Sequence, residues 1–166
     1  MTRRQFVSTA VAALGVGSLS SLIMSRGVSM ASQSPATFEV TKTDAEWKKI
    51  LTPQQYSVLR QHGTEPAGSS PLNKEHRKGA FYCAGCELPV FSSVNKYESG
   101  TGWPSFWAPL ENAVGTTVDR SLLMVRTEVH CRRCGGHLGH VFEDGPPPTG
   151  RRYCLNGAAL RFKPAE

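Results

Sequence analysis

Two Cys-x-x-Cys motifs constrain the fold of this chain more than any other feature. The first is "CAGC", with Cys83 and Cys86, and the second is "CRRC", with Cys131 and Cys134. Each motif places two thiolates on one tight turn, so the two motifs together predict a closed, structural zinc site with four sulfur ligands. The long gap between Cys86 and Cys131 indicates that the metal would join distant parts of a larger domain. In an oxidising compartment each pair could also form a disulfide or a redox dithiol, but two identical tight pairs favour zinc.

The N-terminal part of the domain predicts two helices. In "TKTDAEWKKIL", Thr43 and Glu46 form a capping box, and in "TPQQYSVLRQHGTE" Thr52 and Gln55 form another, with Gly63 as the stop signal. The apolar residues of each segment recur on one face and are expected in the core; they are Trp47, Ile50, Leu51, Tyr56 and Leu59. We therefore expect a short helical lead with a structural role.

Beyond these helices the pattern changes to that of β-structure. The stretch "SLLMVRTEVHC" (residues 121–131) alternates as a half-buried strand should, and "GAFYC" (79–83) and "RRYCLN" (151–156) are two further predicted strands. The stretch "EDGPPPTG" (143–150) is typical of a turn-rich loop. Sixteen glycines and eleven prolines in 166 residues also favour a β-rich domain over a helix bundle. The predicted fold class is mainly β, an antiparallel domain with short N-terminal helices.

The first 31 residues have the pattern of a secretory signal peptide. Arg3 and Arg4 precede a weakly apolar run diluted by serine and glycine, and "SMA" gives a small-x-small cleavage pattern ending at Ala31. The arginine pair favours the twin-arginine route, with a general secretion signal that carries two arginines as the alternative. We therefore expect a signal peptide at residues 1–31, a linker at 32–41, a folded domain at 42–166 and a periplasmic location.

Removal of the signal changes the charge of the protein. The whole chain has a net charge of +6, whereas residues 32–166 hold 16 basic and 13 acidic residues, a net charge of +3 that a four-thiolate zinc site would lower further. A nearly neutral domain has little electrostatic attraction for nucleic acid. No cysteine lies near the cleavage site to carry a lipid. We expect no nucleic-acid partner and no stable membrane anchor.

The fifth cysteine, Cys154, lies apart from both motifs. On a strand, Arg152, Cys154 and Asn156 project from one face, while Tyr153 and Leu155 project from the other. The thiol would then lie between a cation, which favours thiolate, and an amide that can donate hydrogen bonds. A buried inert cysteine is the commoner role of a lone thiol. The surroundings favour a reactive nucleophile.

Two further stretches have residues suited to chemistry. In "GGHLGHVFEDGP", His137 and His140 lie in what we expect to be a glycine-bracketed turn, where both rings could face one cavity. In "ESGTGWPSFW", Trp103, Phe106 and Trp107 lie close together, and a Gly-Trp-Pro turn can present an indole as the wall of an apolar pocket. Each histidine alone could equally be a surface or core residue, and an aromatic cluster is usually core.

Taken in order, these motifs resemble the methionine-R-sulfoxide reductases, the MsrB family. The resemblance runs from about Thr41 to Phe162 and rests on "QHGTE", "YCAGC", "KYESGTGWPSF", "VHCRRCGGHLGHVFEDGP" and "RRYCLNGAAL". It implies a fold of two antiparallel β-sheets with short N-terminal helices and one structural zinc on the four paired cysteines. It also implies reduction of the R epimer of methionine sulfoxide, mainly in oxidised proteins or peptides.

The resemblance assigns roles to individual residues. Cys154 would attack the sulfoxide sulfur and become a sulfenic acid, while His137 or His140 protonates the departing oxygen. Asn156 would help to hold that oxygen. Trp103 would form the wall for the substrate's methyl group, and Arg152 is a further expected substrate-binding residue.

Two departures from the family pattern qualify this assignment. Many relatives carry a resolving cysteine where this chain has Thr101, and four of the five cysteines are expected on zinc. We therefore predict a single-cysteine enzyme whose sulfenic acid is reduced by an external thiol, either a thioredoxin-like protein or a small thiol. Gly157 stands where serine is usual, and we expect a modest effect on local rigidity.

Two rival functions remain on the sequence alone. A non-catalytic zinc module that binds protein or nucleic acid would use the four cysteines but leave Cys154, His137 and His140 without a role. A thiol peroxidase would use Cys154, although the aromatic wall favours a methylated thioether over peroxide as substrate.

Overall fold

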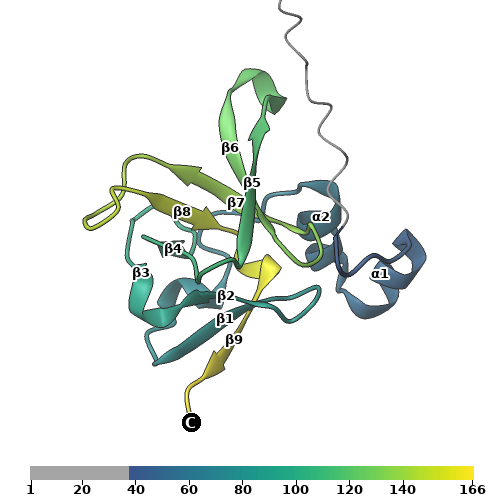
Figure 1. Cartoon of the computed structure of the whole chain (residues 1–166), viewed down its shortest axis with the longest axis horizontal. Coiled ribbons are helices and arrows are strands. Elements are labelled where there is room, and N and C mark those ends of the chain that lie inside the picture. The colour runs from purple at the N-terminus through teal and green to yellow at the C-terminus, as the bar shows by residue number, and fades with distance from the viewer. Residues whose placement is uncertain (1–37) are drawn as a thin grey trace, which may run out of the picture. The chain divides into compact units, whose positions relative to one another are not determined.

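Two antiparallel β-sheets and two short helices make up the folded part of the chain, as the sequence predicts (Figure 1). The computed structural model describes residues 38–166, which fall in one compact unit. The predicted signal peptide and residues 32–37 of the predicted linker lie outside the described residues.

The smaller sheet has three strands and the larger sheet has six. The smaller has the order β2-β1-β9, formed by Pro89–Ser92, Gly79–Cys83 and Leu160–Pro164. The larger has the order β3-β4-β8-β7-β6-β5, formed by Lys96–Tyr97, Ser105–Phe106, Arg152–Leu155, His137–Phe142, Arg126–Cys131 and Val114–Asp119. Strand β8 therefore lies inside the larger sheet, paired with β4 on one side and β7 on the other.

The two helices, α1 (Asp44–Ile50) and α2 (Pro53–Gln61), begin where the sequence predicts. Both capping boxes are present, and each cap threonine accepts a hydrogen bond from a backbone N–H in the first turn. Four of the five apolar residues expected in the core are buried. The prediction is wrong for Ile50, because its side chain is 49% exposed at the end of the helix. Within residues 38–166, no helix has the length and apolar character needed to cross a bilayer.

The end of α2 also differs from the prediction. His62, not Gly63, takes the left-handed conformation that terminates the helix, with φ of 55°, and the Gly63 N–H then donates to the Ser57 carbonyl. Histidine tolerates this conformation better than most residues. Its ring is held there by Glu128, 3.0 Å away.

The predicted strand at residues 121–131 is half right. Strand β6 begins only at Arg126, while Ser121–Leu123 forms a 3-10 turn at the end of the β5–β6 hairpin. The turn closes early because the Asp119 carboxylate accepts the Ser121 N–H and pairs with Arg126. The apolar alternation of Leu123 and Val125 therefore lies outside the sheet.

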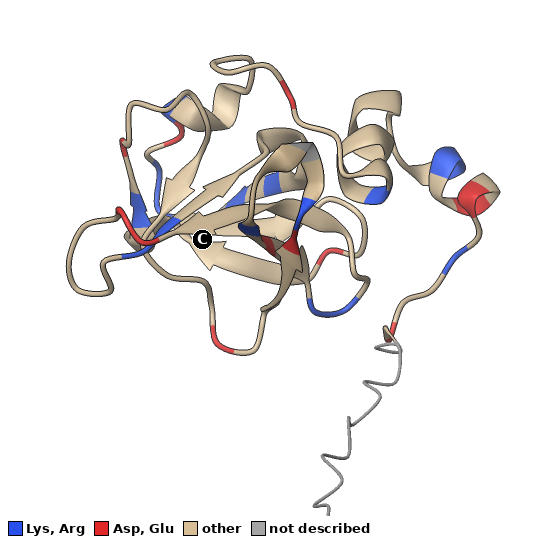
Figure 2. Ribbon diagram, turned by 90° about the horizontal axis from the view of Figure 1, so that it is seen from above, with Lys and Arg blue, Asp and Glu red and all other residues tan. Residues whose placement is uncertain are grey.

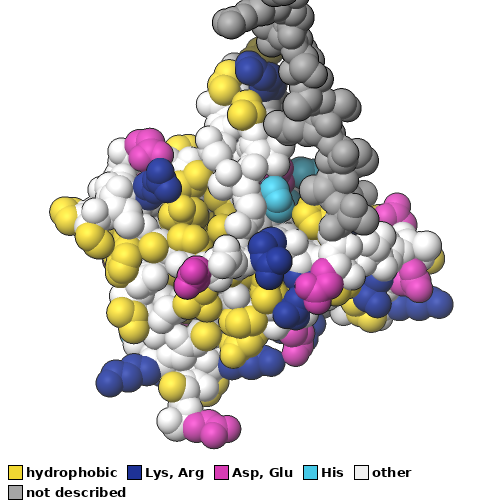
Figure 3. Space-filling view, in the orientation of Figure 1, with side chains coloured by type: hydrophobic (Ala, Val, Ile, Leu, Met, Phe, Trp, Pro, Cys, Tyr) yellow, Lys and Arg dark blue, Asp and Glu magenta, His cyan; other side chains and the backbone are white. Residues whose placement is uncertain are grey.

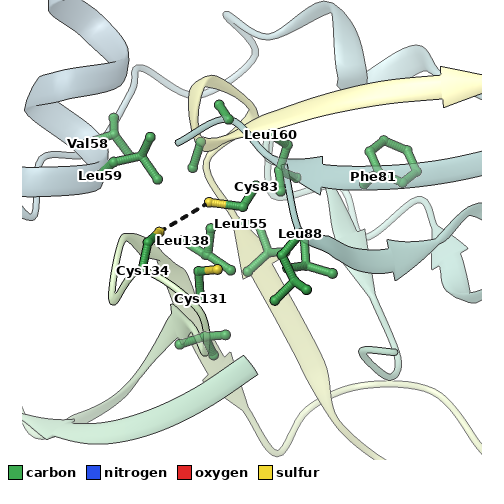
Figure 4. Packing of buried hydrophobic residues seen from close by; sticks show 14 of the residues in the cluster. Val58, Leu59, Phe81, Cys83, Leu88, Cys131, Cys134, Leu138, Leu155 and Leu160 are labelled. Carbon is green, nitrogen blue, oxygen red and sulfur yellow. Dashed lines mark hydrogen bonds between the residues drawn. The ribbon is translucent and has the colours of Figure 1, made fainter. Parts of the chain in front are cut away.

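The core fills the space between the two sheets. Phe106 packs edge-on against Phe81, with ring centroids 4.9 Å apart, and at a tilt against Phe91, with centroids 4.6 Å apart; all three rings are fully buried. Phe106 thus belongs to the core rather than to a pocket. Figure 4 shows the core continuing past Leu138, Leu155 and Leu160 to the cysteine sulfurs. On the surface, basic and acidic residues are interspersed around the described part of the chain (Figure 2).

Candidate active site

The four paired cysteines converge on one point between the two sheets. Their sulfur atoms all lie within 4.8 Å of one another, with 3.7 Å between Cys83 and Cys134 and 3.5 Å between Cys86 and Cys131. A tetrahedral zinc with Zn–S bonds of about 2.3 Å has sulfurs about 3.8 Å apart, whereas a disulfide needs about 2.05 Å. The spacing therefore fits a tetrahedral metal and does not fit two disulfides.

The two Cys-x-x-Cys turns have the same local geometry. The residue after each motif, Glu87 or Gly135, is left-handed, with φ of 59° and 66°. Each donates its N–H to the carbonyl of the first cysteine of its motif, at 2.9 Å in both cases. Cys83 ends β1 of the smaller sheet and Cys131 ends β6 of the larger sheet. A metal here would join the two sheets, as the long gap in the sequence predicts.

Cys154 lies at the centre of the larger sheet, on β8. Tyr153 and Leu155 face the core, while Cys154 and Arg152 are half-buried on the other face, which confirms the predicted alternation for residues 152–155. Asn156 follows the end of the strand and is buried. Cys154 faces Ser105 of β4 and His140 of β7. The thiol lines a hollow of about 130 Å³. Its other lining residues are Thr64, Trp103, Arg126, Gly139, His140, Phe142, Leu155 and Asn156.

His137 and His140 lie on strand β7 and not in the expected turn. Residues three apart on a regular strand face opposite sides, yet these two rings lie 5.3 Å apart. The reason is a bulge, because Val129 pairs with Gly139 while the next residue, His130, pairs with His137. A Cβ at Gly139 would lie 2.2 Å from the Cys154 carbonyl oxygen, so glycine lets β8 approach the bulge.

His137 is held by a carboxylate that the sequence analysis did not single out. Its Nδ1 lies 2.7 Å from Glu128 Oε1, the same oxygen that binds His62 Nδ1 at 3.0 Å. Burial would raise the pKa of Glu128, but the hydrogen bond to His137 and the nearby histidines hold that pKa below its usual value. His137 is 2% exposed, and its Nε2 has no hydrogen-bond partner in residues 38–166. This ring nitrogen is itself buried, and His137 lines the neighbouring hollow with His140 rather than the hollow around Cys154.

His140 has a different partner. Its Nε2 lies 2.8 Å from Asp119 Oδ2, which also accepts from Arg126 at 2.7 Å. Hydrogen bonds from Ser121 and then from His140 and Arg126 hold the pKa of Asp119 well below its ordinary range. Burial lowers the pKa of His140, and the hydrogen bond with Asp119 opposes this only in part. Burial therefore favours the neutral form of the His140 ring.

Glu65 ties three parts of the site together. Its backbone N–H donates to Asn156 Oδ1 at 3.0 Å, and its carbonyl accepts from Trp103 Nε1 at 3.0 Å. Its buried carboxylate accepts the N–H groups of Gly157 and Ala158, at 2.6 and 2.8 Å. The Asn156 amide also donates to the Leu138 carbonyl at 3.2 Å. Trp103 and Asn156, both predicted site residues, are thus fixed by one loop residue.

The absence of a side chain at Gly157 has a steric reason. A Cβ at this position would lie 1.9 Å from Ser70 Oγ. The Ser70 hydroxyl thus fills the space that a serine at 157 would need. Gly157 therefore meets a packing constraint, and the expected modest effect on local rigidity stays a prediction.

Thr101 lies beside the nucleophile candidate. Its Oγ1 is 3.8 Å from Cys154 Sγ, at the position where the family pattern often has a resolving cysteine. Thr101 is also joined to Ser99 at 2.8 Å, and Ser99 to the buried Ser105 at 2.7 Å. A chain of hydroxyl groups therefore leads to the thiol.

Arg152 points to a different partner from the one expected. Its guanidinium forms two hydrogen bonds with Asp144, at 2.9 and 2.8 Å, and lies 4.5 Å from the Phe142 ring centroid. The Asp144 carboxylate raises the pKa of Arg152, with a smaller contribution from Cys154. Arg152 does not line the hollow around the thiol. Its predicted contact with substrate stays a prediction.

Four polar residues of the site were not singled out from the sequence: Glu65, Asp119, Arg126 and Glu128. Arg126 and Glu128 do alternate on one face of β6, which is a signal that the sequence contains. Glu65 and Asp119 reach the site through contacts between distant segments, and no local pattern marks them.

Comparisons with known proteins agree with this geometry. The family model described as the SelR domain matches residues 51–164. The chain is 55% identical over 127 residues to the peptide methionine sulfoxide reductase MsrB of Leptospira interrogans, covering 76% of this chain and 97% of the relative. It is 50% identical to the protein of that name from Agrobacterium fabrum (76% and 94% covered) and 55% identical to that of Methanosarcina barkeri (76% and 90% covered).

Proposed function

The chain belongs to the SelR family and is a peptide methionine sulfoxide reductase of the MsrB type, and from this premise we propose that it reduces the R epimer through Cys154. The observation that carries the proposal is the placement of Cys154 in a hollow with His140, Trp103 and Asn156, apart from the four clustered cysteines. The substrates would be oxidised proteins or peptides that contain methionine R-sulfoxide.

The proposed step transfers one oxygen and two electrons. The Cys154 thiolate attacks the sulfoxide sulfur while a histidine donates a proton to the sulfoxide oxygen. The attack forms a bond between the two sulfur atoms. The hydroxyl then passes from the methionine sulfur to the Cys154 sulfur as this sulfur–sulfur bond breaks, so methionine leaves as the reduced thioether and Cys154 is oxidised to the sulfenic acid. Two external thiols then return Cys154 to the thiol and release a disulfide and water.

His137 and His140 share the proton transfer in this scheme. Glu128 on Nδ1 orients the His137 ring, and its buried Nε2, which has no hydrogen-bond partner in the described residues, would exchange a proton only once the substrate is bound. His140 lines the hollow with the thiol and is oriented by Asp119. Trp103 provides the apolar wall for the methyl group, and its indole is fixed by the Glu65 carbonyl.

We propose zinc as the metal of the four-cysteine cluster, with a structural role only. Four thiolates at tetrahedral spacing leave no coordination position for a substrate. The ligands come from both sheets, so the metal supplies stability to the fold that holds Cys154.

The reductase would be of the single-cysteine type, with an external reductant. Thr101 takes the place beside Cys154 where a resolving thiol would lie, and the other four cysteines are in the cluster. A thioredoxin-like protein or a small thiol would reduce the sulfenic acid. Treatment of the zinc-loaded protein with methionine sulfoxide, followed by mass spectrometry, should give a sulfenic acid at Cys154; an intramolecular disulfide would contradict this proposal.

The first experiment compares the protein with its Cys154→Ser variant. Each is given the separate R and S epimers of N-acetyl-methionine sulfoxide with dithiothreitol as reductant. Turnover of the R epimer alone, abolished in the variant, is the expected result. Turnover of both epimers would overturn the R specificity, and undiminished activity of Cys154→Ser would overturn the nucleophile. Turnover of hydrogen peroxide but of neither epimer would favour a thiol peroxidase.

We also propose that the protein acts in the periplasm after twin-arginine export. The motif at Arg3 and Arg4 motivates this location, and it suits a domain that acquires its metal before transport. Cell fractionation with the Arg3→Lys, Arg4→Lys variant as the control tests it. Finding the unaltered protein only in the cytoplasm would exclude export.

A further inference from the structure

Exposed apolar side chains are concentrated on one hairpin of this domain. Among the side chains of residues 38–166 whose burial the structure describes, the exposed large hydrophobic ones are Ile50, Val94, Val118, Leu123, Met124 and Val125. Four of these six belong to the β5–β6 hairpin, and Leu123 and Val125 are 106% and 71% exposed. We call residues 118–125 the apolar tip. In the space-filling view, hydrophobic side chains lie at this projecting end of the molecule (Figure 3).

The apolar tip has a defined conformation. Its base is closed by the ion pair of Asp119 and Arg126, and the Met124 N–H donates to the Ser121 carbonyl at 3.1 Å. Leu123 is left-handed, with φ of 59°, a conformation that costs an ordinary residue about 1 to 2 kcal/mol. This conformation directs the Leu123 side chain fully into solvent, where it gains no packing energy in the free protein.

The first residues of the apolar tip border a groove that adjoins the hollow around Cys154, and Leu123, Met124 and Val125 lie just beyond the lining of this groove. A hollow of about 450 Å³ is lined by Val118, Arg120 and Ser121 of the tip and by Glu128, His137 and His140 of the sheet. This hollow shares Thr64, Arg126 and His140 with the hollow around Cys154. Asp119 also connects the two directly, since it binds both His140 and the Ser121 N–H.

We propose that the apolar tip docks the polypeptide that carries the oxidised methionine, as an extended segment with apolar residues beside the sulfoxide. The proposal rests on the proposed function and extends it to the substrate class. Methionine is commonly buried, so its neighbours in an unfolded substrate include apolar side chains that the tip can cover. The groove between the tip and Cys154 is lined by arginine, histidine and carboxylate groups, which can bind backbone amides of a peptide.

The test compares two classes of substrate in two variants. The tip variant carries Leu123→Ser, Met124→Ser and Val125→Ser. The control variant carries Val94→Ser, which removes a valine of similar exposure in the turn at Ser93–Asn95, outside the apolar tip. Each protein is assayed with N-acetyl-methionine R-sulfoxide and with two peptides of about twelve residues. One peptide has leucine and valine around a central methionine R-sulfoxide, and the other has serine and glycine.

We expect kcat/KM for the apolar peptide to fall about tenfold in the tip variant, equal to about 1.4 kcal/mol. The rates with the small substrate and with the polar peptide should stay within about twofold, and the control variant should match the unaltered protein. An equal loss on all three substrates would indicate damage to the catalytic site and overturn the proposal. No loss on the apolar peptide would also overturn it.

Two further arms separate this proposal from its alternatives. Sedimentation with vesicles of phosphatidylethanolamine and phosphatidylglycerol tests a lipid surface, and tip-dependent vesicle binding without any change in peptide kinetics would assign the tip to membranes instead. Fluorescence anisotropy with a labelled apolar peptide measures docking without turnover. If the unaltered protein fails to reduce the small substrate, the proposed function is wrong, and the anisotropy still decides whether the tip binds a polypeptide.

Discussion

The four-cysteine cluster and Cys154 place the same functional group in opposite surroundings. In the cluster each sulfur has other sulfurs as neighbours, at 3.5 and 3.7 Å, and three of the four cysteines are buried. Around Cys154 the neighbours are a hydroxyl, a histidine and an amide, and the thiol faces a hollow. The cluster joins two sheets at their ends, whereas Cys154 lies in the middle of one sheet.

The difference shows that the neighbours of a thiol decide its role. Thiolates that converge at tetrahedral spacing bind a metal and are withdrawn from redox chemistry. A thiol with oxygen and nitrogen neighbours and an open approach can react with a substrate. Changing either set of neighbours should therefore change the role of the sulfur.

The largest effect is expected from breaking the cluster. Cys131→Ser removes one ligand and should lose the metal and about 5 kcal/mol of the free energy of unfolding, because metal binding is coupled to the fold. Thermal unfolding and metal content by mass spectrometry measure this. Cys154→Ser is the matched control and should keep both the metal and the unfolding temperature. Equal stability of the two variants would contradict a structural metal.

The second change gives Cys154 a sulfur neighbour. In Thr101→Cys the new thiol should lie close to Cys154, because the Thr101 hydroxyl is 3.8 Å from Cys154 Sγ. After one turnover without reductant, we expect an intramolecular disulfide and the loss of two free thiols per chain, counted with a thiol reagent. Thr101→Ser should lose one thiol at most. A persistent sulfenic acid in Thr101→Cys would show that the geometry does not allow closure.

A smaller effect is expected from weakening the loop that supports Cys154. Glu65→Gln replaces one acceptor oxygen with an NH₂ group that faces a backbone N–H, at a cost of about 1 to 3 kcal/mol. Because Glu65 also positions Trp103 and Asn156, activity should fall while the metal stays bound. Denaturant unfolding and kcat/KM test this together. Loss of metal in this variant would show that the four-cysteine cluster and the site around Cys154 are not independent.

Gly157→Ser should have a similar or smaller cost, about 1 to 3 kcal/mol. The new side chain would enter the space of the Ser70 hydroxyl. The double variant Gly157→Ser, Ser70→Gly should recover most of the lost stability in chemical unfolding. If the single variant is as stable as the unaltered protein, the Ser70 side chain moves freely and the packing argument fails.

The smallest effect is expected on the pH dependence of activity. Asp119 raises the pKa of His140 against the effect of burial, so Asp119→Asn should lower that pKa further. If His140 supplies the proton, kcat/KM falls as the pH rises through its pKa, and in the variant this fall should begin at a lower pH. The pH profile with the small R-sulfoxide substrate measures the shift, with Glu128→Gln for comparison. An unchanged profile would assign the proton to another group.

Local patterns predicted the parts of the structure that depend on neighbours in sequence. The capping boxes at Thr43 and Thr52, the cysteine pairs and the alternation around Cys154 were all confirmed. Parts that depend on strand register were not predicted. The turn at Ser121 and the bulge beside His137 follow from how β5, β6 and β7 pair, which no local pattern contains.

The same reasoning explains the residues that were missed. Glu65 forms hydrogen bonds with Asn156 and Gly157, which lie 91 and 92 residues further along the chain. Asp119 binds His140, which is 21 residues away in sequence. A glutamate at the end of a helical lead gives no local sign of such a partner. Residues that orient others are therefore visible only after the fold is known.

The position of β8 has a consequence for how the protein is made. A chain leaves the ribosome from its N-terminus, so strands β3 to β7 appear before Arg152. Until β8 inserts between β4 and β7, the larger sheet exists only as two separate pieces, β3-β4 and β7-β6-β5. The strand that closes the sheet is the strand that carries Cys154, so a chain that ends before β8 lacks both the complete larger sheet and this thiol. The Cys154 thiol therefore reaches its place beside His140 in the same step that completes the larger sheet.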